Sequence, residues 1–179
     1  MVRAFFAVDL TADIRNEFYP VQDALRNSDA KLTCVNPALL HITMKFLGEI
    51  SDELMATIQG AISDYSFEPT EISVSGVRLH PKKRPRLVWA DAGDNGWCAA
   101  RVAELDEILA PLGIARETRI FTPHITIARI KRYDPSLRAA AAEVSDHVFG
   151  RMRVDTIALK KSTLTPQGPV YEDIMEITA

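Results

Sequence analysis

An α+β protein made of two related lobes is the fold that the sequence predicts. Segments with strand-like alternation and segments with helical spacing follow one another along 179 residues, which is the length of one domain. The pattern strand, helix, strand, helix, strand occurs twice, and His-Ile-Thr lies at the same place in each copy. We therefore expect a single bilobal domain, 1–179, with an internal repeat of roughly 1–82 and 83–179. Each lobe should contain an antiparallel sheet and two helices.

The first half begins with an expected strand at 3–10. The helix after this strand carries an apolar stripe, and Pro20 within it should kink or split that helix. The next strand is expected at 41–47. Ser51 can cap a second helix, and the alternation over 72–77 predicts another strand.

The second half starts after a basic, proline-containing loop, HPKKRPR, at 80–86. Helical spacing, a helix-stopping glycine and an Asp-Pro helix start indicate its helices. The expected elements are a strand at 86–92, a helix ending at Gly113, a strand at 123–130, a helix starting at Asp134, and closing strands at 152–164 and 170–178, with PQGP as the turn between the last two.

The two halves are related by a constant offset of 83 positions between His41 and His124. Identities at this offset are few, so the repeat is weak in sequence and clearer in pattern. The same offset places Arg3 on Arg86 and Leu54 on Leu137. A pseudo-two-fold axis would bring the equivalent strands together and put His41 and His124 across one active-site cleft between the lobes.

The first His strand, HITMKFLGEI, has one apolar and one polar face when read with strict alternation. His41, Thr43 and Lys45 share the polar face, so Lys45 is a candidate contact for a phosphate, weighed equally against a solvated lysine. Phe46 falls on the opposite, apolar face, which predicts a core position. A solvated strand face more often carries Glu, Lys, Ser or Thr than histidine.

The second His strand, PHITIARI, places His124 and Thr126 on one face. Arg129 lies three residues after Thr126, and strict alternation would put it on the opposite face. Either the strand bulges or ends after Ala128, or the Arg129 side chain curls around the rim of the site. An exposed arginine in a surface ion pair is the alternative.

Two imidazoles that face each other suit proton transfer, because histidine titrates near neutral pH and one ring can be neutral while the other is charged. Each threonine adds a hydroxyl donor on the same face. Paired donors between two histidines can hold the oxygens of a phosphoryl group, and in-line displacement at phosphorus needs acid and base on opposite sides. The residues predict metal-free phosphodiester cleavage.

A metal site is a competing interpretation of the histidines. Zinc takes three or four His, Cys or acidic ligands, and the chain has four histidines. The other two, His80 and His147, have no ligand spacing to the pair, so we do not expect a metal site.

Composition limits the class of protein. Net charge is −3, which argues against a protein that coats long nucleic acid but permits binding of one phosphate or a short strand. No apolar run is long enough to cross a membrane, and the short run near the N-terminus is interrupted by Asp9, so a first strand is favoured over a signal peptide. We expect a cytoplasmic monomer. Basic clusters lie at 82–86, 129–132 and 160–161, and each alone indicates a solvated loop.

The stretches RAFFAVDL, HITMKFLGEI and PHITIARI, together with the duplicated order of elements, resemble the 2H phosphoesterases over nearly the whole chain. Within them the chain is similar to the RNA 2′,3′-cyclic phosphodiesterases, also called 2′-5′ RNA ligase-like proteins. The resemblance implies a bilobal α+β fold and opening of a terminal 2′,3′-cyclic phosphate of RNA to a 2′-phosphate. It also implies that neither a metal nor a nucleotide cofactor is needed. RNA 3′ ends such as tRNA fragments would be the partners, and ligase activity stays open.

By position, the resemblance makes His41 the general acid for the departing 3′ oxygen and His124 the base that activates water, and the two roles could be exchanged. Thr43 and Thr126 would hold the phosphate, and Arg129 matches the basic residue after the second motif. The alternatives are a non-catalytic module that binds phosphorylated RNA ends, or the same chemistry on small cyclic nucleotides or 2′-5′ oligonucleotides. Candidates for a base-stacking platform are Phe6, Phe46, Tyr133 and Tyr171.

Overall fold

The computed structural model describes all 179 residues. The strands are β1 (Val2–Asp9), β2 (Lys31–Cys34), β3 (His41–Ile50), β4 (Thr70–His80), β5 (Leu87–Gly93), β6 (His124–Arg132), β7 (Val148–Val154), β8 (Thr156–Thr165) and β9 (Gly168–Thr178). The helices are α1 (Ala12–Asn16), α2 (Phe18–Arg26), α3 (Asp52–Ile62), α4 (Trp97–Leu109) and α5 (Ser136–Glu143), with short 3-10 helices η1 (Pro37–Leu39) and η2 (Ala110–Leu112). None of the helices is long and apolar enough to cross a membrane.

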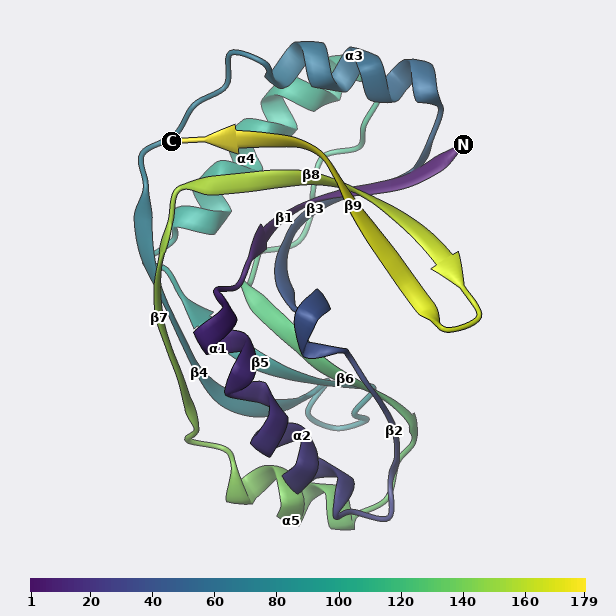
Figure 1. Ribbon diagram of the computed structural model, residues 1–179, viewed down its shortest axis with the longest axis vertical. Coiled ribbons are helices and arrows are strands. Elements are labelled where there is room, and N and C mark those ends of the chain that lie inside the picture. The colour runs from purple at the N-terminus through teal and green to yellow at the C-terminus, as the bar shows by residue number, and fades with distance from the viewer.

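All nine strands belong to one antiparallel sheet. Its order is β7-β4-β5-β6-β3-β1-β8-β9, and β2 pairs with β6 off this path. Figure 1 shows the sheet curling into two lobes, with α3 and α4 over one lobe and α1, α2 and α5 over the other. The predicted bilobal α+β fold is confirmed.

The lobes do not coincide with the two halves of the sequence repeat. The first lobe combines β1, β3 and α3 with β8, β9 and α4 from the second half, and α4 packs against α3 and β3. The other lobe combines β5, β6, β7 and α5 with α1, α2 and β4 from the first half. The halves therefore exchange elements. Hydrophobic periodicity marks which residues are buried but does not say which part of the sheet covers them.

The break that Pro20 was expected to cause in the first helix is confirmed, because the helix splits at Glu17 and Pro20 lies in the first turn of α2. The physical reason is that a proline ring clashes with the carbonyl four residues earlier, here Asn16, and offers no N–H to it. Two other local expectations need correction. The expected strand at 152–164 is the end of β7 followed by β8. Asp134 accepts a hydrogen bond from Ser136 N at 2.9 Å, yet α5 begins one residue after Pro135.

The two His strands meet at the centre of the sheet. β3 pairs with β6 antiparallel, with Ile42 opposite Ile125, and these two residues are equivalent in the repeat. An antiparallel pair has a local two-fold axis between paired residues, so the pseudo-two-fold of the sequence passes through this point. Both isoleucines are fully buried in a core of 38 apolar residues that runs through both lobes.

Candidate active site

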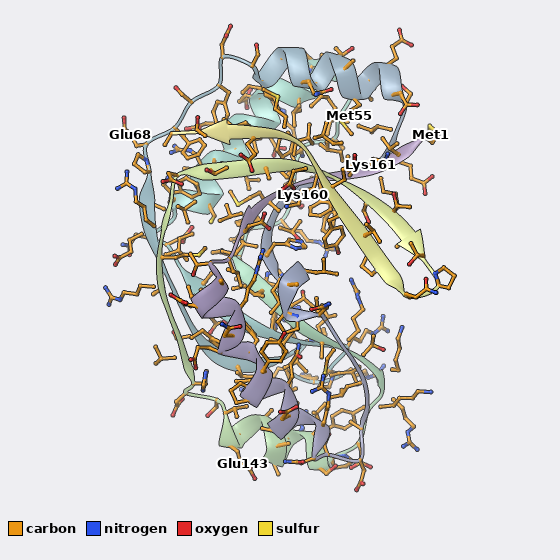
Figure 2. All side chains as sticks on the ribbon, in the orientation of Figure 1. Met1, Met55, Glu68, Glu143, Lys160 and Lys161 are labelled. Carbon is orange, nitrogen blue, oxygen red and sulfur yellow. The ribbon has the colours of Figure 1, made fainter.

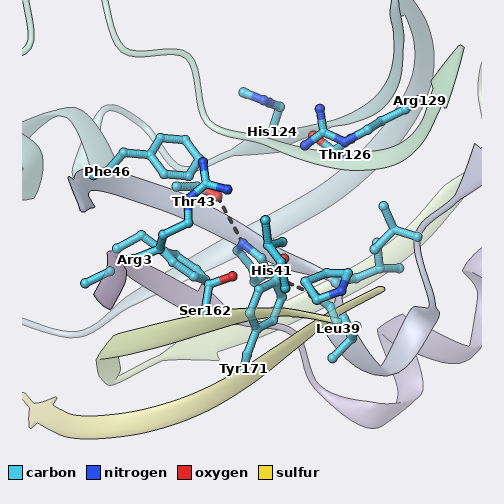
Figure 3. Close-up of a pocket in the computed structure, with 17 residues that line it drawn as sticks. Arg3, Leu39, His41, Thr43, Phe46, His124, Thr126, Arg129, Ser162 and Tyr171 are labelled. Atoms are coloured by element: carbon cyan, nitrogen blue, oxygen red, sulfur yellow. Dashed lines mark hydrogen bonds between the residues drawn. The ribbon is translucent and has the colours of Figure 1, made fainter. Parts of the chain in front are cut away.

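A pocket of about 550 Å³ lies where the two lobes meet. Its lining comes from β1, β3, β6, β8 and β9 and from the segment around η1, so both lobes contribute to it. Figure 3 shows His41 and Thr43 on one side of this pocket and His124, Thr126 and Arg129 on the other.

Four polar side chains of the two His strands line the pocket: His41, Thr43, His124 and Thr126. Because Ile42 and Ile125 pair antiparallel and point into the core, their neighbours point to the opposite face, which is the pocket. The same register brings His41 beside Thr126 and Thr43 beside His124. Each lobe thus supplies one histidine and one threonine, and the prediction that His41 and His124 share one site is supported by their common pocket.

A bulge in β6 explains how Arg129 reaches this pocket. Thr126 lies opposite Trp89 and Ala128 opposite Val88, so Ile127 is an extra residue in β6. Alternation is shifted by one position after a bulge. Of the alternatives open from the sequence, the structure matches the bulge, and Arg129 lines the pocket with its side chain exposed.

An equivalent bulge in β3 makes two expectations wrong. Thr43 pairs with Ala7 and Lys45 pairs with Phe6, so Met44 is the extra residue. Phe46, expected in the core, is therefore 73% exposed and lines the pocket. Lys45, for which a phosphate contact and a solvated position were the two alternatives, occupies neither, because it turns to the buried face and is only 6% exposed.

The partners of Lys45 confirm that it does not serve the pocket. Its ammonium forms a buried ion pair with Asp106 of α4 and donates a hydrogen bond to the carbonyl of Ala115 at 2.8 Å. The other oxygen of Asp106 accepts from Glu117 N at 2.9 Å. Lys45 and Asp106 thereby anchor the segment that leads from α4 toward His124.

The two histidines have the same hydrogen-bond arrangement. Nδ1 of His41 lies 2.8 Å from the carbonyl oxygen of Leu39, and Nδ1 of His124 lies 2.8 Å from that of Thr122. A carbonyl only accepts, so each Nδ1 carries the hydrogen and each neutral ring keeps Nε2 as an acceptor. Nε2 of His41 accepts from the hydroxyl of Thr43 at 3.0 Å (Figure 3). Both rings are held in the tautomer that a general base needs.

Burial lowers the pKa of both catalytic candidates. For His41, desolvation is the main cause, opposed by the hydrogen bond to Leu39 and by the Asp9 carboxylate. For His124, desolvation again leads, opposed by the Thr122 carbonyl. Both imidazoles therefore favour the neutral form more than a free histidine does.

Aromatic side chains form walls around each imidazole. The ring of His41 lies 5.0 Å from that of Phe5 and 5.4 Å from that of Tyr171, measured between centroids. The ring of His124 stands nearly perpendicular to Trp89 at 3.9 Å. These contacts restrict both rings and remove water from around them, which is the physical origin of the lowered pKa values.

A charged cluster lies next to His41. Lys160 of β8 is 5% exposed, donates to Asp9 at 2.7 Å and pairs with Asp173 as well. Burial alone would lower the pKa of Lys160, but the two carboxylates raise it above its ordinary value, so the ammonium stays charged. Figure 2 shows Lys160 and its neighbour Lys161 in the lobe that carries α3. Asp9 is opposite His41 in the β1–β3 pairing.

Sequence reasoning missed two polar groups in the pocket. Arg3 of β1 and Ser162 of β8 line it, and Figure 3 shows the guanidinium of Arg3 beside Thr43. Arg3 had a signal, because the repeat offset pairs it with another arginine. Tyr171, one of four proposed stacking residues, lines the pocket, whereas Phe6 is fully buried.

Neither additional histidine joins the pair. His80 packs against Trp89 at 3.8 Å, and His147 lies beside Glu17 at 3.4 Å. No group of three or more His, Cys, Asp and Glu side chains is arranged to hold a metal ion.

Comparison with known proteins identifies the family. The model of the LigT-like phosphoesterases matches residues 8–89 and 95–171, which is most of the chain. The chain belongs to this family. It is 36% identical to an RNA 2′,3′-cyclic phosphodiesterase of Archaeoglobus fulgidus over 97% of this chain and 98% of that protein. It is 35% identical to one of Methanocaldococcus jannaschii, over 98% and 99% of the two chains.

Solved structures agree with the fold. A crystal structure from Thermus thermophilus superposes with a TM-score of 0.77 at 28% identity, covering 98% of this chain and 97% of that one. Escherichia coli LigT in complex with 3′-AMP gives the same TM-score at 21% identity, covering 99% and 97%. At that identity the likeness to LigT concerns the fold alone.

Proposed function

We propose that this LigT-like phosphoesterase is a metal-independent RNA 2′,3′-cyclic phosphodiesterase that leaves a 2′-phosphate. The observation that carries the proposal is that His41, Thr43, His124 and Thr126 line one pocket, on either side of the paired Ile42 and Ile125. The names of the relatives that align along nearly the whole chain support the substrate class. The hydrolase class follows from the same relatives and from the family.

The proposed reaction uses the two imidazoles as base and acid. His124 accepts a proton from water through Nε2 as the water oxygen bonds to phosphorus, and protonated His41 gives its Nε2 proton to the 3′ oxygen as the P–O3′ bond breaks. Thr43 and Thr126 donate hydrogen bonds to the non-bridging oxygens, and Arg129 adds positive charge at the rim. The Nδ1 hydrogen bonds keep both rings oriented throughout. Water supplies all atoms of the second reactant, so no cofactor is needed.

A product assay tests this function. The protein is incubated in EDTA with 2′,3′-cyclic AMP and with a short RNA that ends in a 2′,3′-cyclic phosphate, and phosphorus NMR follows the products. We expect a 2′-monophosphate resonance, because the proposed leaving group is the 3′ oxygen. A 3′-monophosphate product would show that the 2′ oxygen is the leaving group instead. Loss of turnover in EDTA would indicate a metal hydrolase. Unchanged substrates together with tight binding would indicate a non-catalytic binding module.

The pH dependence of the reaction follows from the lowered pKa values. The active form has one neutral and one charged imidazole, and its population peaks between the two pKa values of the free protein. Burial lowers the pKa of both His41 and His124 below the ordinary value of 6.5, so kcat/KM should be maximal below pH 6.5. Above that pH, kcat/KM should fall with a slope that approaches tenfold per pH unit. A bound phosphate anion favours the imidazolium, so kcat should peak at higher pH than kcat/KM. A kcat/KM that rises from pH 6.5 to 8 would contradict this.

A further inference from the structure

About half of the Lys and Arg side chains of this acidic protein have no carboxylate partner. The chain has 21 Lys and Arg residues, and ten of them pair with a carboxylate. Of the eleven others, one is Arg3, which lines the pocket, and one is Arg119. The other nine lie together: the cations of 82–86, those of 129–132, Lys31 and Arg138. We call these nine the basic surface. All nine side chains are exposed.

Backbone pairing holds the parts of the basic surface next to one another. Arg86 O accepts from Ile130 N at 2.8 Å, which joins the β4–β5 loop to the end of β6. Lys31 of β2 lies opposite Arg132 of β6. The guanidinium of Arg138, on α5, donates to the carbonyl of Lys82 at 2.9 Å. The charges therefore lie on adjoining segments rather than being scattered.

The basic surface is continuous with the pocket through Arg129. This residue both lines the pocket and pairs with Leu87, at the start of β5. Beyond the bulge, Arg129 and Lys131 alternate with the half-buried Ile130, so both point to the outer face of β6. A chain that leaves the pocket past Arg129 meets the basic surface at once.

An exposed aromatic side chain follows directly after the last residue of the same strand. Tyr133 is 37% exposed, and the guanidinium of Arg138 lies 5.8 Å from its ring centroid. Tyr133 is four residues from Arg129, about 13 Å along an extended strand. The nearby carboxylate of Asp134 is occupied with Ser136 at the start of α5. Unpaired cations beside an exposed aromatic are the combination that single-stranded nucleic acid binds.

We propose that the nucleotides on the 5′ side of the terminal phosphate cross the basic surface toward Tyr133, so that an RNA strand is a better substrate than a cyclic mononucleotide. The inference rests on the proposed function for the chemistry at the terminus, but the surface itself can be tested separately. We expect RNA to bind at the basic surface rather than elsewhere on this negatively charged protein. Apart from Arg3 and Arg119, every cation outside the basic surface forms an ion pair with an Asp or Glu side chain.

The test compares two variants with the same net charge. The surface variant is Lys82→Gln/Lys83→Gln/Arg84→Gln, on an exposed loop outside the pocket. The control is Arg116→Gln/Arg151→Gln/Arg153→Gln, whose cations are exposed and ion-paired elsewhere. The measured quantity is the ratio of kcat/KM for a decaribonucleotide that ends in a cyclic phosphate to kcat/KM for 2′,3′-cyclic AMP.

We expect this ratio to fall at least tenfold in the surface variant and to stay within twofold of wild type in the control. The dependence of log Kd on log salt, measured by anisotropy with a decaribonucleotide that ends in a 3′-phosphate, should become shallower by about 2, since three phosphate contacts at about 0.7 each are removed. Equal ratios and equal salt slopes in the two variants would overturn the proposal.

The binding measurement separates the two proposals. If wild type hydrolyses neither substrate, the proposed function fails, and the anisotropy comparison still decides whether RNA follows the basic surface. If wild type hydrolyses both substrates equally well and the surface variant binds RNA as wild type does, the function stands and the surface inference is wrong.

Discussion

His41→Ala and His124→Ala should each lower kcat by about 10²- to 10⁴-fold, the range that one general acid or base contributes. Both rings point Nε2 at the same pocket and have Nδ1 fixed by a carbonyl, so neither can replace the other. The double variant should be little worse than the slower single variant, because the two groups act in one step. Turnover is measured with the RNA that ends in a cyclic phosphate.

Matched controls separate chemistry from folding. His147→Ala removes a partly buried histidine that contacts Glu17 and Phe149 away from the pocket, and it should change kcat less than twofold. Melting temperatures show whether each variant is folded. A folded His41→Ala or His124→Ala protein with full activity would eliminate the proposed mechanism.

The pH profiles of the residual activity assign the two roles. A variant without the acid needs only a neutral base, so its kcat/KM should rise with pH to a plateau. A variant without the base needs only a charged acid, so its kcat/KM should fall as pH rises through the remaining pKa. The proposal predicts the rising profile for His41→Ala and the falling profile for His124→Ala. The opposite pair of profiles would exchange the roles.

The sequence could predict the histidines and threonines because period-two alternation holds over the three residues of each motif. The same alternation gives the wrong face for Lys45 and Phe46, four and five residues after His41. The reason is that the bulge at Met44 depends on pairing with β1 and not on the local residues. The equivalent bulge in β6 is one of the alternatives that the sequence leaves open, because strict alternation would put Arg129 on the face opposite His124 and Thr126. A single residue per strand therefore decided which side chains enter the site.

The remaining pocket residues could not be predicted from the sequence for a different reason. Arg3, Ser162 and Tyr171 enter the pocket from strands that are far apart in the chain. Their placement depends on β8 and β9 pairing beside β1, which closes the lobe around His41. The exchange of helices between the halves likewise depends on long-range packing. The sequence therefore predicts the repeat, but it does not predict which lobe each helix covers.

Lys45→Met should destabilise the protein by about 3 kcal/mol, which is the lower end of the cost of breaking a buried ion pair. The variant leaves Asp106 buried without its countercharge and Ala115 O without its donor. For a chain of this size the melting temperature should fall by roughly 6 to 12 °C. Thermal unfolding followed by circular dichroism measures the change. Arg151→Met, which breaks an exposed ion pair with Glu71, should cost less than about 1 kcal/mol.

The same variant distinguishes a structural role from a substrate contact. If Lys45 only anchors the segment between α4 and His124, then below its melting temperature Lys45→Met should bind the 3′-phosphorylated RNA as wild type does. A lysine that contacts phosphate would behave in the opposite way, because its loss would leave stability unchanged and make the salt dependence of binding shallower by about 0.7. Normal stability together with weakened, less salt-dependent binding would therefore return Lys45 to the phosphate site. It would also require β3 to continue past Met44 without the bulge that places Phe46 in the pocket.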